Sequence, residues 1–254
     1  MKSAVIDIGN SRIKILSEEH GFAVIPINET GGDWLDELQQ FVGKHTFPSS
    51  WAISSVNPNA ETVVIDMLMG YSSIITSSEY ILDNQTLVDI RQVNGAGSDR
   101  IFGLIGALEY TKPPLITVDC GTAITINYLD GGSVFQGGAI LPGISTQLKA
   151  LHHFTGQLPL LHPEYEDVAY GNTTVQAMTV GAVWGAVGAI KEITSRIKTS
   201  AGNPTIPIVF TGGEHPLVVS AFEDSEPILS PHLVAEGILL AYKSLEPENS
   251  TDSE

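Results

Sequence analysis

Two turns in the sequence combine an aspartate, a glycine and small polar side chains, a combination suited to holding phosphate. They are Asp7-Ile8-Gly9-Asn10-Ser11 and Asp119-Cys120-Gly121-Thr122-Ala123. Glycine lets the backbone approach a ligand closely, and successive N–H groups, with side chains such as Asn10 or Thr122, can donate to phosphate oxygens. The aspartates would repel phosphate directly. We therefore expect them to bind cations, with Asp7 orienting a hydrated Mg²⁺ on the β- and γ-phosphates of a nucleotide.

The duplication of this turn favours a functional interpretation over a structural one. A single strand-ending Asp-x-Gly is often only a turn, but turn chemistry predicts no second copy. A P-loop is excluded, because the sequence contains no G-x-x-x-x-G-K-[ST] segment. The matched pair therefore predicts a phosphate site of another kind.

A third candidate segment, Gly97-Ser98-Asp99-Arg100, opens a predicted helix. Asp99 falls in the first turn of that helix, where carboxylates are common caps. In the functional alternative, Asp99 is a base for a substrate hydroxyl, and Arg100 is a fork for a substrate carboxylate or a transferring phosphate. The chain has only four arginines, so an arginine beside an acid in a glycine-rich segment favours the functional alternative.

The remaining candidates are weaker. Thr174 precedes a long predicted helix and is a hydrogen-bonding residue at its start, a substrate contact, or both. His152 and His153 lack metal-ligand spacing, so we expect them to be solvated or packed. Cys120 is expected to be a small buried side chain rather than a nucleophile. Residues 137–143 are either a strand flanked by turns or the lining of a cleft opposite the first aspartate turn.

The surroundings of the two Asp-x-Gly turns match. Each turn follows a β-rich run (4–6 or 115–118) and precedes an alternating run (12–15 or 124–128), a hairpin signal and a further β-rich run. This predicts a duplicated α/β fold whose two turns face one cleft. The boundary is expected at two prolines, which gives domains over 1–112 and 113–245 and a disordered acidic tail over 246–254.

Other patterns predict helices over 34–42, 101–110 and 175–197, and strands over 51–56 and 206–210. The long helix carries Gly181, Gly185 and Gly188 at helical spacing. These glycines would allow another helix to approach closely, within the subunit or across a dimer.

Composition limits the partners and the location. The formal net charge is −17, which disfavours nucleic acid, because phosphate backbones are held by clustered Lys and Arg. No apolar run approaches the roughly 20 residues that span a bilayer, and an acid at position 7 comes too early for a signal peptide. The single cysteine cannot form an internal disulfide, so we expect a cytoplasmic protein.

These segments resemble, in order, the motifs of type III pantothenate kinase, a branch of the superfamily of acetate and sugar kinases, heat-shock ATPases and actin. The two turns resemble its first phosphate motif, Asp-x-Gly-Asn-Thr, and its second phosphate motif. Residues 97–100 resemble its pantothenate motif, Gly-x-Asp-Arg, while 137–143 resemble its interface motif and 210–213 its nucleotide-end motif. Each motif is modest alone, but five in family order are highly specific.

The resemblance implies duplicated actin-like (ribonuclease H-like) domains, each a mixed sheet flanked by helices, with the active-site cleft between them. It implies ATP-dependent phosphorylation of pantothenate to 4′-phosphopantothenate, the first step of coenzyme A biosynthesis, by a homodimer that uses Mg²⁺ and K⁺ or NH₄⁺. Asp99 would be the general base, and Asp119 would help to bind the monovalent cation. The residues implied for ATP are Asp7, Ile8, Gly9, Asn10, Ser11, Arg12, Ile13, Lys14 and Thr122. Those implied for pantothenate are Gly97, Ser98, Asp99, Arg100 and Thr174.

The sequence departs from the family pattern at two places. Ser11 replaces the usual threonine and keeps the hydroxyl. Many members carry a Tyr and a Pro shortly before Gly-x-Asp-Arg, and the Tyr helps to close the pantothenate pocket, whereas residues 84–96 contain neither and Ile90 stands near the Tyr position. A kinase for another small alcohol therefore stays an alternative, as does a nucleotide-binding regulatory protein, since the family is also associated with a transcription accessory factor. The Asp99-Arg100 pair favours catalysis, because a pure binder needs no base.

Overall fold

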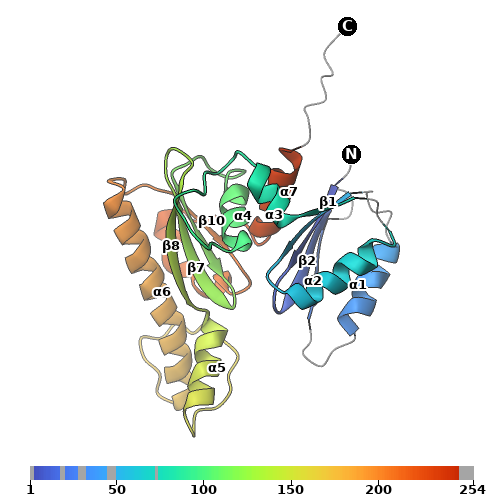
Figure 1. Ribbon diagram of the computed structural model, residues 1–254. Helices are drawn as coiled ribbons and strands as arrows, with labels where there is room; N and C mark the ends of the chain where they lie inside the picture. Colours follow the sequence, from blue (N-terminus) through green and yellow to red (C-terminus); the bar gives the residue numbers. More distant parts are fainter. Residues whose placement is uncertain (1–2, 18–20, 28–32, 45–49, 72–73, 246–254) are drawn as a thin grey trace. The chain divides into compact units, whose positions relative to one another are not determined.

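The computed structural model describes residues 3–17, 21–27, 33–44, 50–71 and 74–245 (Figure 1). The chain forms two compact units. The first comprises Met1–Val88, Asn94–Glu109 and His232–Glu254, and the second comprises Asp89–Val93 and Tyr110–Pro231. The acidic tail that the sequence predicts to be disordered, 246–254, lies outside the described residues.

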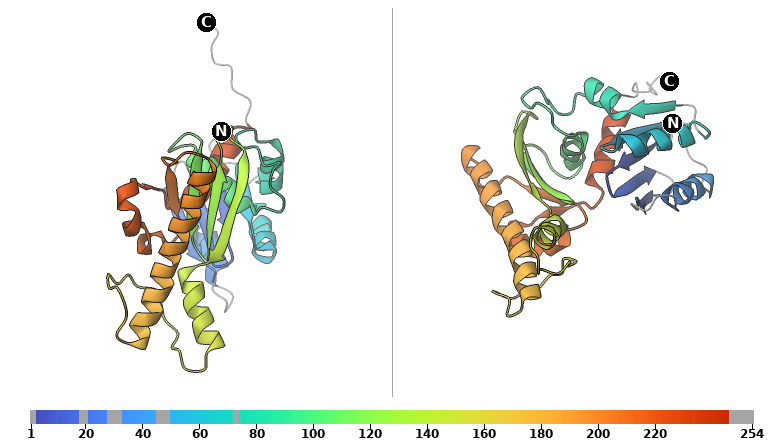
Figure 2. Two further views of the ribbon diagram at one scale, coloured as in Figure 1. Left: turned by 90° about the vertical axis from the view of Figure 1, so that its left-hand side faces the viewer. Right: turned by 60° about the horizontal axis from the view of Figure 1, so that its bottom comes forward.

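The first unit contains a mixed five-stranded sheet in the order β3-β2-β1-β4-β5. Its strands are β1 (Ser3–Ile8), β2 (Arg12–Ser17), β3 (Gly21–Pro26), β4 (Ser50–Ser55) and β5 (Ile74–Ser77). Its helices are α1 (Asp33–Lys44), α2 (Pro58–Leu68), α3 (Ser78–Asn84), α4 (Ser98–Ala107) and α7 (Leu233–Lys243). Alternate residues of β1, Ala4, Ile6 and Ile8, pack into a core with α1 and α2. The opposite face of the sheet is covered by α4 and α7 (Figures 1 and 2).

The second unit contains a mixed five-stranded sheet in the order β10-β9-β6-β7-β8. Its strands are β6 (Leu115–Cys120), β7 (Ala123–Leu129), β8 (Phe135–Pro142), β9 (Ile208–Thr211) and β10 (Ile228–Leu229). Its helices are α5 (Ile144–Phe154), α6 (Thr174–Ser200) and the short 3₁₀ segments η1 (His215–Leu217) and η2 (Val219–Ser225). One hydrophobic core joins β6, β7 and β9 to α5, α6 and η2. In Figure 2, α6 runs along the sheet with α5 beside its amino-terminal half.

The two sheets have the same topology, which confirms the predicted duplication. In each sheet an antiparallel meander of three strands is followed by two strands that run parallel to the first, on its other side. Asp7 is the penultimate residue of β1 and pairs with Lys14, and Asp119 is the penultimate residue of β6 and pairs with Thr125. Each unit thus places its aspartate at the carboxyl end of the central strand.

The last helix, α7, belongs to a different unit from the one that the sequence predicts. The sequence places 113–245 in the second domain, but residues from His232 onward belong to the first unit. Two glycines allow α7 to pack against α4 in the first unit. A Cβ on Gly106 of α4 would overlap the Leu233 carbonyl, and a Cβ on Gly237 of α7 would overlap the Phe102 carbonyl. The two helices therefore touch backbone to backbone, and α4 is held by a helix from the far end of the chain.

The other predicted elements are present with small shifts at their ends. The predicted helices appear as α1, α4 and α6, although α4 ends at Ala107 rather than residue 110. The predicted strands 51–56 and 206–210 appear as β4 and β9, and 137–142 form most of β8, while the lining of a cleft by this segment stays a prediction. Across the described ranges, no helix combines the length and apolarity that crossing a membrane requires.

Candidate functional site

The carboxylate of Asp7 is buried at the end of β1. The residue is 8% exposed, and the Nζ atom of Lys14, its partner on β2, lies 3.4 Å from Asp7 Oδ2. Burial raises the pKa of Asp7, Lys14 counteracts that rise, and the negative charge of Asp99 adds to it. A further cation near this carboxylate would relieve the cost of burying its charge.

The neighbouring strand β4 connects Asp7 to the start of α4. Ser54 is the register partner of Asp7 in the parallel β1–β4 pair, so the two side chains share one face of the sheet. Ser54 is buried, and its hydroxyl oxygen lies 3.1 Å from that of Ser98, the first residue of α4. The first unit thus brings together the first Asp-x-Gly turn and the Gly97–Arg100 segment. Sequence reasoning missed Ser54, although its position near the end of a predicted buried strand could have indicated it.

Asp99 lies half-buried in the first turn of α4. Its Oδ1 accepts a hydrogen bond from the Arg100 N–H at 2.9 Å. A Cβ on Gly97 would lie 2.5 Å from that same oxygen, so a glycine at this position leaves room for the carboxylate. Desolvation lowers the pKa of Arg100, while the charge of Asp99 raises it. An acid and a partly desolvated guanidinium are therefore presented together at the helix start.

The other residues of the first turn divide by exposure. The side chains of Ile8 and Ile13 belong to the hydrophobic core, so only their main-chain groups could contact a ligand. The N–H of Gly9 donates to the Arg12 carbonyl at 2.9 Å and closes the turn. The exposed residues of the turn are Asn10, Ser11 and Arg12.

In the second unit, the turn after β6 rests on the start of α5. The carbonyl of Thr122 accepts hydrogen bonds from the Gly143 N–H at 2.9 Å and from the Thr146 hydroxyl at 2.6 Å. A Cβ on Gly143 would overlap the carbonyls of Gly121 and Thr122. The backbone of this turn is thus fixed, while the Thr122 side chain is exposed.

Glu214 joins three segments of the second unit and was missed by sequence reasoning. Its N–H donates to the Cys120 carbonyl at 2.8 Å. Its carboxylate accepts hydrogen bonds from the N–H groups of Ile144 at 2.9 Å and Ser145 at 3.2 Å, the first two residues of α5. A negative charge is favourable at that helix end. The available signal was an acid directly after the Gly212-Gly213 junction.

Asp119 and Cys120 are the last two residues of β6, next to the hydrogen bonds made by Glu214. Gly212 has a φ of 88°, and a Cβ there would overlap the Asp119 carboxylate and the Cys120 carbonyl. Cys120 is fully buried, and burial, together with the charges of Asp119 and Glu214, raises the pKa of its thiol. The expected burial of Cys120 is confirmed, and the raised pKa of its thiol favours the interpretation that it is no nucleophile.

The residue that caps the amino end of α6 is Thr173 rather than Thr174. Thr173 Oγ1 accepts a hydrogen bond from the Gln176 N–H at 3.2 Å, and Gln176 Oε1 accepts one from the Asn172 N–H at 3.1 Å. The pair resembles a capping box, except that Gln176 accepts from the residue before the N-cap rather than from the N-cap N–H. Thr174 is the first helical residue and is exposed, so its contact with a substrate stays a prediction.

The two histidines of α5 lie on the surface of the second unit. His152 and His153 are exposed, and His152 Nδ1 lies 2.7 Å from the Leu158 carbonyl oxygen. Within the described ranges, no group of three or more His, Cys, Asp or Glu is placed to hold a metal ion. The exposure of the two histidines agrees with the expectation that they are solvated.

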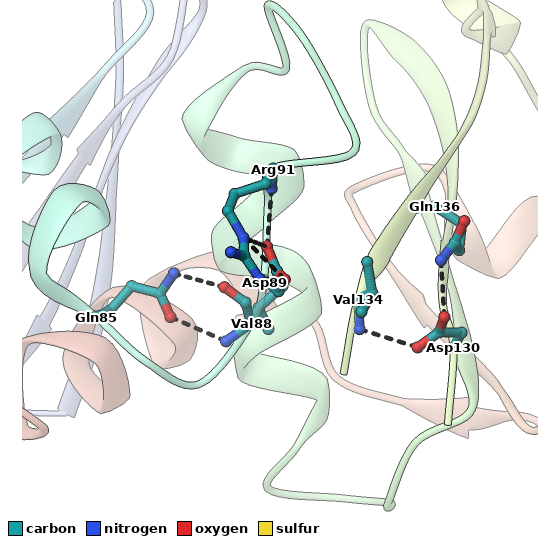
Figure 3. Close-up of polar contacts among 7 residues, drawn as sticks. All are labelled: Gln85, Val88, Asp89, Arg91, Asp130, Val134 and Gln136. Atoms are coloured by element: carbon teal, nitrogen blue, oxygen red, sulfur yellow. Dashed lines mark hydrogen bonds and ion pairs between the residues drawn. The ribbon is translucent and has the colours of Figure 1, made fainter. Parts of the chain in front are cut away.

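The segment that lacks the expected tyrosine is fixed by its own polar contacts (Figure 3). The buried Gln85 donates to the Val88 carbonyl at 2.8 Å and accepts from the Val88 N–H at 3.0 Å. Arg91 Nη2 lies 2.6 Å from Asp89 Oδ2, and the hydrogen bonds from Arg91 lower the pKa of Asp89 to about 2. Ile90, which stands between Asp89 and Arg91 in the sequence, is half-buried.

The main chain of Asp89 is bound to the β7–β8 hairpin. Its N–H donates to the Ser133 carbonyl and its carbonyl accepts from the Phe135 N–H, both at 2.8 Å. The hairpin is closed by Asp130, whose Oδ2 accepts from Gln136 Nε2 at 2.7 Å (Figure 3). Residues 89–93 therefore belong to the second unit by hydrogen bonding as well as by packing.

Comparison with known proteins identifies related sequences. The sequence model of a protein family described as type III pantothenate kinase matches residues 4–196. A protein named type III pantothenate kinase from Listeria monocytogenes serotype 4a is 36% identical over 151 residues, which span 59% of this chain and 58% of that protein. One of the same name from Akkermansia muciniphila is 28% identical over 250 residues, which cover 95% of this chain and 98% of that protein.

Solved structures support the expected fold. A Campylobacter jejuni protein assigned to the Baf family of transcriptional activators has a TM-score of 0.65 and 22% identity, and the match covers 94% of this chain and 97% of that one. An archaeal actin homologue has a TM-score of 0.52 and 11% identity, with 96% and 100% covered. The predicted actin-like α/β fold in two domains is thereby confirmed.

Replacement of Glu214 tests its role as a brace. Glu214→Ala should lower the free energy of unfolding by about 1–2 kcal/mol, because two N–H groups of α5 lose their acceptor. Glu214→Gln keeps an oxygen acceptor and should cost less. Urea unfolding measures both, with the exposed Glu223→Ala as a control that should change stability by less than about 0.5 kcal/mol. Equal stability of the two alanine variants would contradict the brace.

Proposed function

The chain belongs to the type III pantothenate kinase family, and on that basis we propose that it transfers the γ-phosphoryl group of ATP to pantothenate, giving 4′-phosphopantothenate. The observation that carries the proposal lies in the first unit, where Ser54, the register partner of Asp7, has its hydroxyl oxygen 3.1 Å from that of Ser98, the residue before Asp99. A carboxylate of the first phosphate turn and a candidate base are therefore brought to one side of the first sheet. Phosphoryl transfer depends on such positioning of the nucleotide against the acceptor.

In the proposed reaction, Asp99 accepts the proton of the acceptor hydroxyl. The hydroxyl oxygen forms a bond to the γ-phosphorus as the bond from that phosphorus to the leaving ADP oxygen breaks. Arg100, whose guanidinium is partly desolvated, is suited to hold the pantothenate carboxylate. Gly97, Ser98 and Thr174 complete the proposed acceptor side.

The nucleotide is proposed to bind along the two Asp-x-Gly turns. Donors for its phosphates would come from the exposed side chains of Asn10, Ser11 and Arg12 and from Thr122. A single buried carboxylate, Asp7, fits Mg²⁺ bound through water, because this ion keeps several of its waters in phosphate sites. Mg²⁺ would neutralise charge on the β- and γ-phosphates. A cytoplasmic location stays a prediction.

Substitution of Asp99 tests the proposed base. Asp99→Asn keeps the Oδ1 acceptor for the Arg100 N–H but removes the proton acceptor. It should lower kcat by roughly 10²- to 10⁴-fold and leave ATP affinity nearly unchanged. The assay is ADP release with ATP and a panel of small alcohols, among which pantothenate should give the highest kcat/KM.

A matched control for this substitution is Glu79→Gln, which neutralises an acid in the first turn of another helix, α3. It should retain full turnover, and melting curves confirm that both variants fold. A folded Asp99→Asn protein with near-normal kcat would remove Asp99 from the base role. If only another alcohol supports ADP release, that alcohol replaces pantothenate as the proposed acceptor. If no alcohol supports ADP release, the regulatory alternative is favoured.

Asp119 is proposed to bind a monovalent cation, K⁺ or NH₄⁺. Its carboxylate lies among main-chain carbonyls at the second turn, a donor set of oxygens that suits a hard cation. Turnover in K⁺ should exceed turnover in Na⁺ alone, and Asp119→Asn should weaken activation by K⁺ roughly tenfold. Steady-state rates against K⁺ concentration measure the effect. Equal rates in both salts would remove Asp119 from this role.

A homodimer is proposed to form along α6. Gly181, Gly185 and Gly188 are exposed, and a Cβ on any of them would meet no atom within 4 Å, so within the described residues their close-packing surface has no neighbouring helix. Gly185→Arg should convert the dimer to a monomer without loss of folding. Ser200→Arg, exposed at the end of the same helix, should leave the dimer intact. Light scattering at micromolar concentration distinguishes these outcomes, and an active wild-type monomer would contradict the proposal.

A further inference from the structure

A cavity of about 570 Å³ lies in the second unit, between the carboxyl-terminal half of α6 and the segments that follow it. This volume is within the range typical of small-molecule sites. The lining residues on which its chemistry depends are Lys191, Ser195, Lys198, Asn203, Ile208 and Phe222.

The charge of the cavity is opposite to that of the chain. The sequence has 29 acidic and 12 basic Lys and Arg residues, yet the lining residues whose side chains the structure describes include two lysines and no Asp or Glu. Lys191 and Lys198 are seven residues apart on α6, so they lie on one face of the helix, two turns from each other. The local field therefore favours an anion in a protein that as a whole repels anions.

Both lysines are arranged for such a ligand. The Lys191 Nζ lies 5.4 Å from the centroid of the Phe222 ring, which restricts where its charge can lie. Burial lowers the pKa of Lys198, because its ammonium has lost part of its hydration. An anion between the two groups would restore favourable interactions to that charge.

Neutral groups complete the binding surface. Asn203 Oδ1 accepts hydrogen bonds from the N–H and the hydroxyl of Thr205, at 3.0 and 2.9 Å, which leaves the amide N–H₂ as the donating end of that side chain. Ser195 offers an exposed hydroxyl between the lysines along α6. Ile208 and Phe222 are buried and supply an apolar wall.

The cavity is distinct from the second phosphate turn. Ile208 is the first residue of β9, whereas Gly212 and Glu214, which contact the second turn at Asp119 and Cys120, follow the last residue of the strand. Successive strand residues advance by about 3.3 Å, so Ile208 and Gly212, four residues apart, are separated by about 13 Å along the chain.

We propose that this cavity binds a small organic phosphate, with the dianion between Lys191 and Lys198 and the apolar group against Ile208 and Phe222. Lysine binds phosphate as a point charge, and two lysines match the two charges of a phosphate monoester. The site does not depend on the proposed kinase reaction. The simpler alternative is that Lys198 complements the carboxyl end of α6 and Lys191 packs on Phe222, with no ligand.

Phenyl phosphate is the probe for this site, and its binding is followed at the methyl groups of Ile208 by NMR on the full chain. The Ile208 signals should shift saturably with phenyl phosphate, while phenol at the same concentrations should leave them unchanged. A Lys191→Gln/Lys198→Gln double variant should weaken binding roughly tenfold or more, because both charge-assisted contacts are lost. Lys149→Gln, which removes an exposed charge on α5, should bind as the wild type does.

A second variant, Ser195→Asp, places a carboxylate in the cavity without removing a lysine. It should weaken phenyl phosphate binding through repulsion and leave the melting temperature unchanged, since Ser195 is exposed. The proposal is overturned if the Ile208 signals do not respond to the probe. It is equally overturned if the lysine and aspartate variants bind phenyl phosphate as the wild type does, or if phenol binds as tightly.

Discussion

A carboxylate buried at the end of a central strand is the constraint on which the first unit depends. Asp7 is 8% exposed, and its charge is stabilised by Lys14, which the β1–β2 register places directly opposite. The same strand packs Ile6 and Ile8 into the core with α1 and α2. A slip of one residue would put the carboxylate into that core and the isoleucines on the other face, so the hydrophobic pattern fixes the position of the charge. The register of β4 then places Ser54 beside Asp7.

Duplication produced two turns with one backbone topology and different electrostatics. The partner of Asp119 in the register is Thr125, where Asp7 has Lys14. The second turn is instead braced by Gly143 and by Glu214, whose charge adds to that of Asp119 around Cys120. Asp7 is thus paired with a lysine on the neighbouring strand, whereas the charge of Asp119 acts together with that of Glu214 on Cys120. This asymmetry supports different roles for the two aspartates towards bound cations.

The sequence could predict features that local patterns determine, and it missed those that depend on which segments become neighbours. The strands, the two Asp-x-Gly turns and the helix start at Gly97 follow from alternation, glycine and capping chemistry within short windows. Ser54 gains its meaning only from parallel pairing with Asp7, and Glu214 from reaching α5 across the unit. The return of α7 depends on two glycines far apart in the sequence, Gly106 and Gly237. None of these pairings leaves a periodic signal.

The location of the few basic residues, rather than their number, decides where this acidic chain can bind anions. Arg91 and Arg196 are held in ion pairs with Asp89 and Glu192, at 2.6 and 2.7 Å, and their charges are largely compensated by those neighbours. Lys14 is likewise paired with Asp7. Beyond the exposed side chain of Arg12, phosphate at the two turns must therefore rely on main-chain N–H groups, polar side chains such as Asn10 and Thr122, and bound cations. The α6 cavity differs, because its described lining presents two lysines and no acidic side chain, so an anion there can be bound by the protein's own charges.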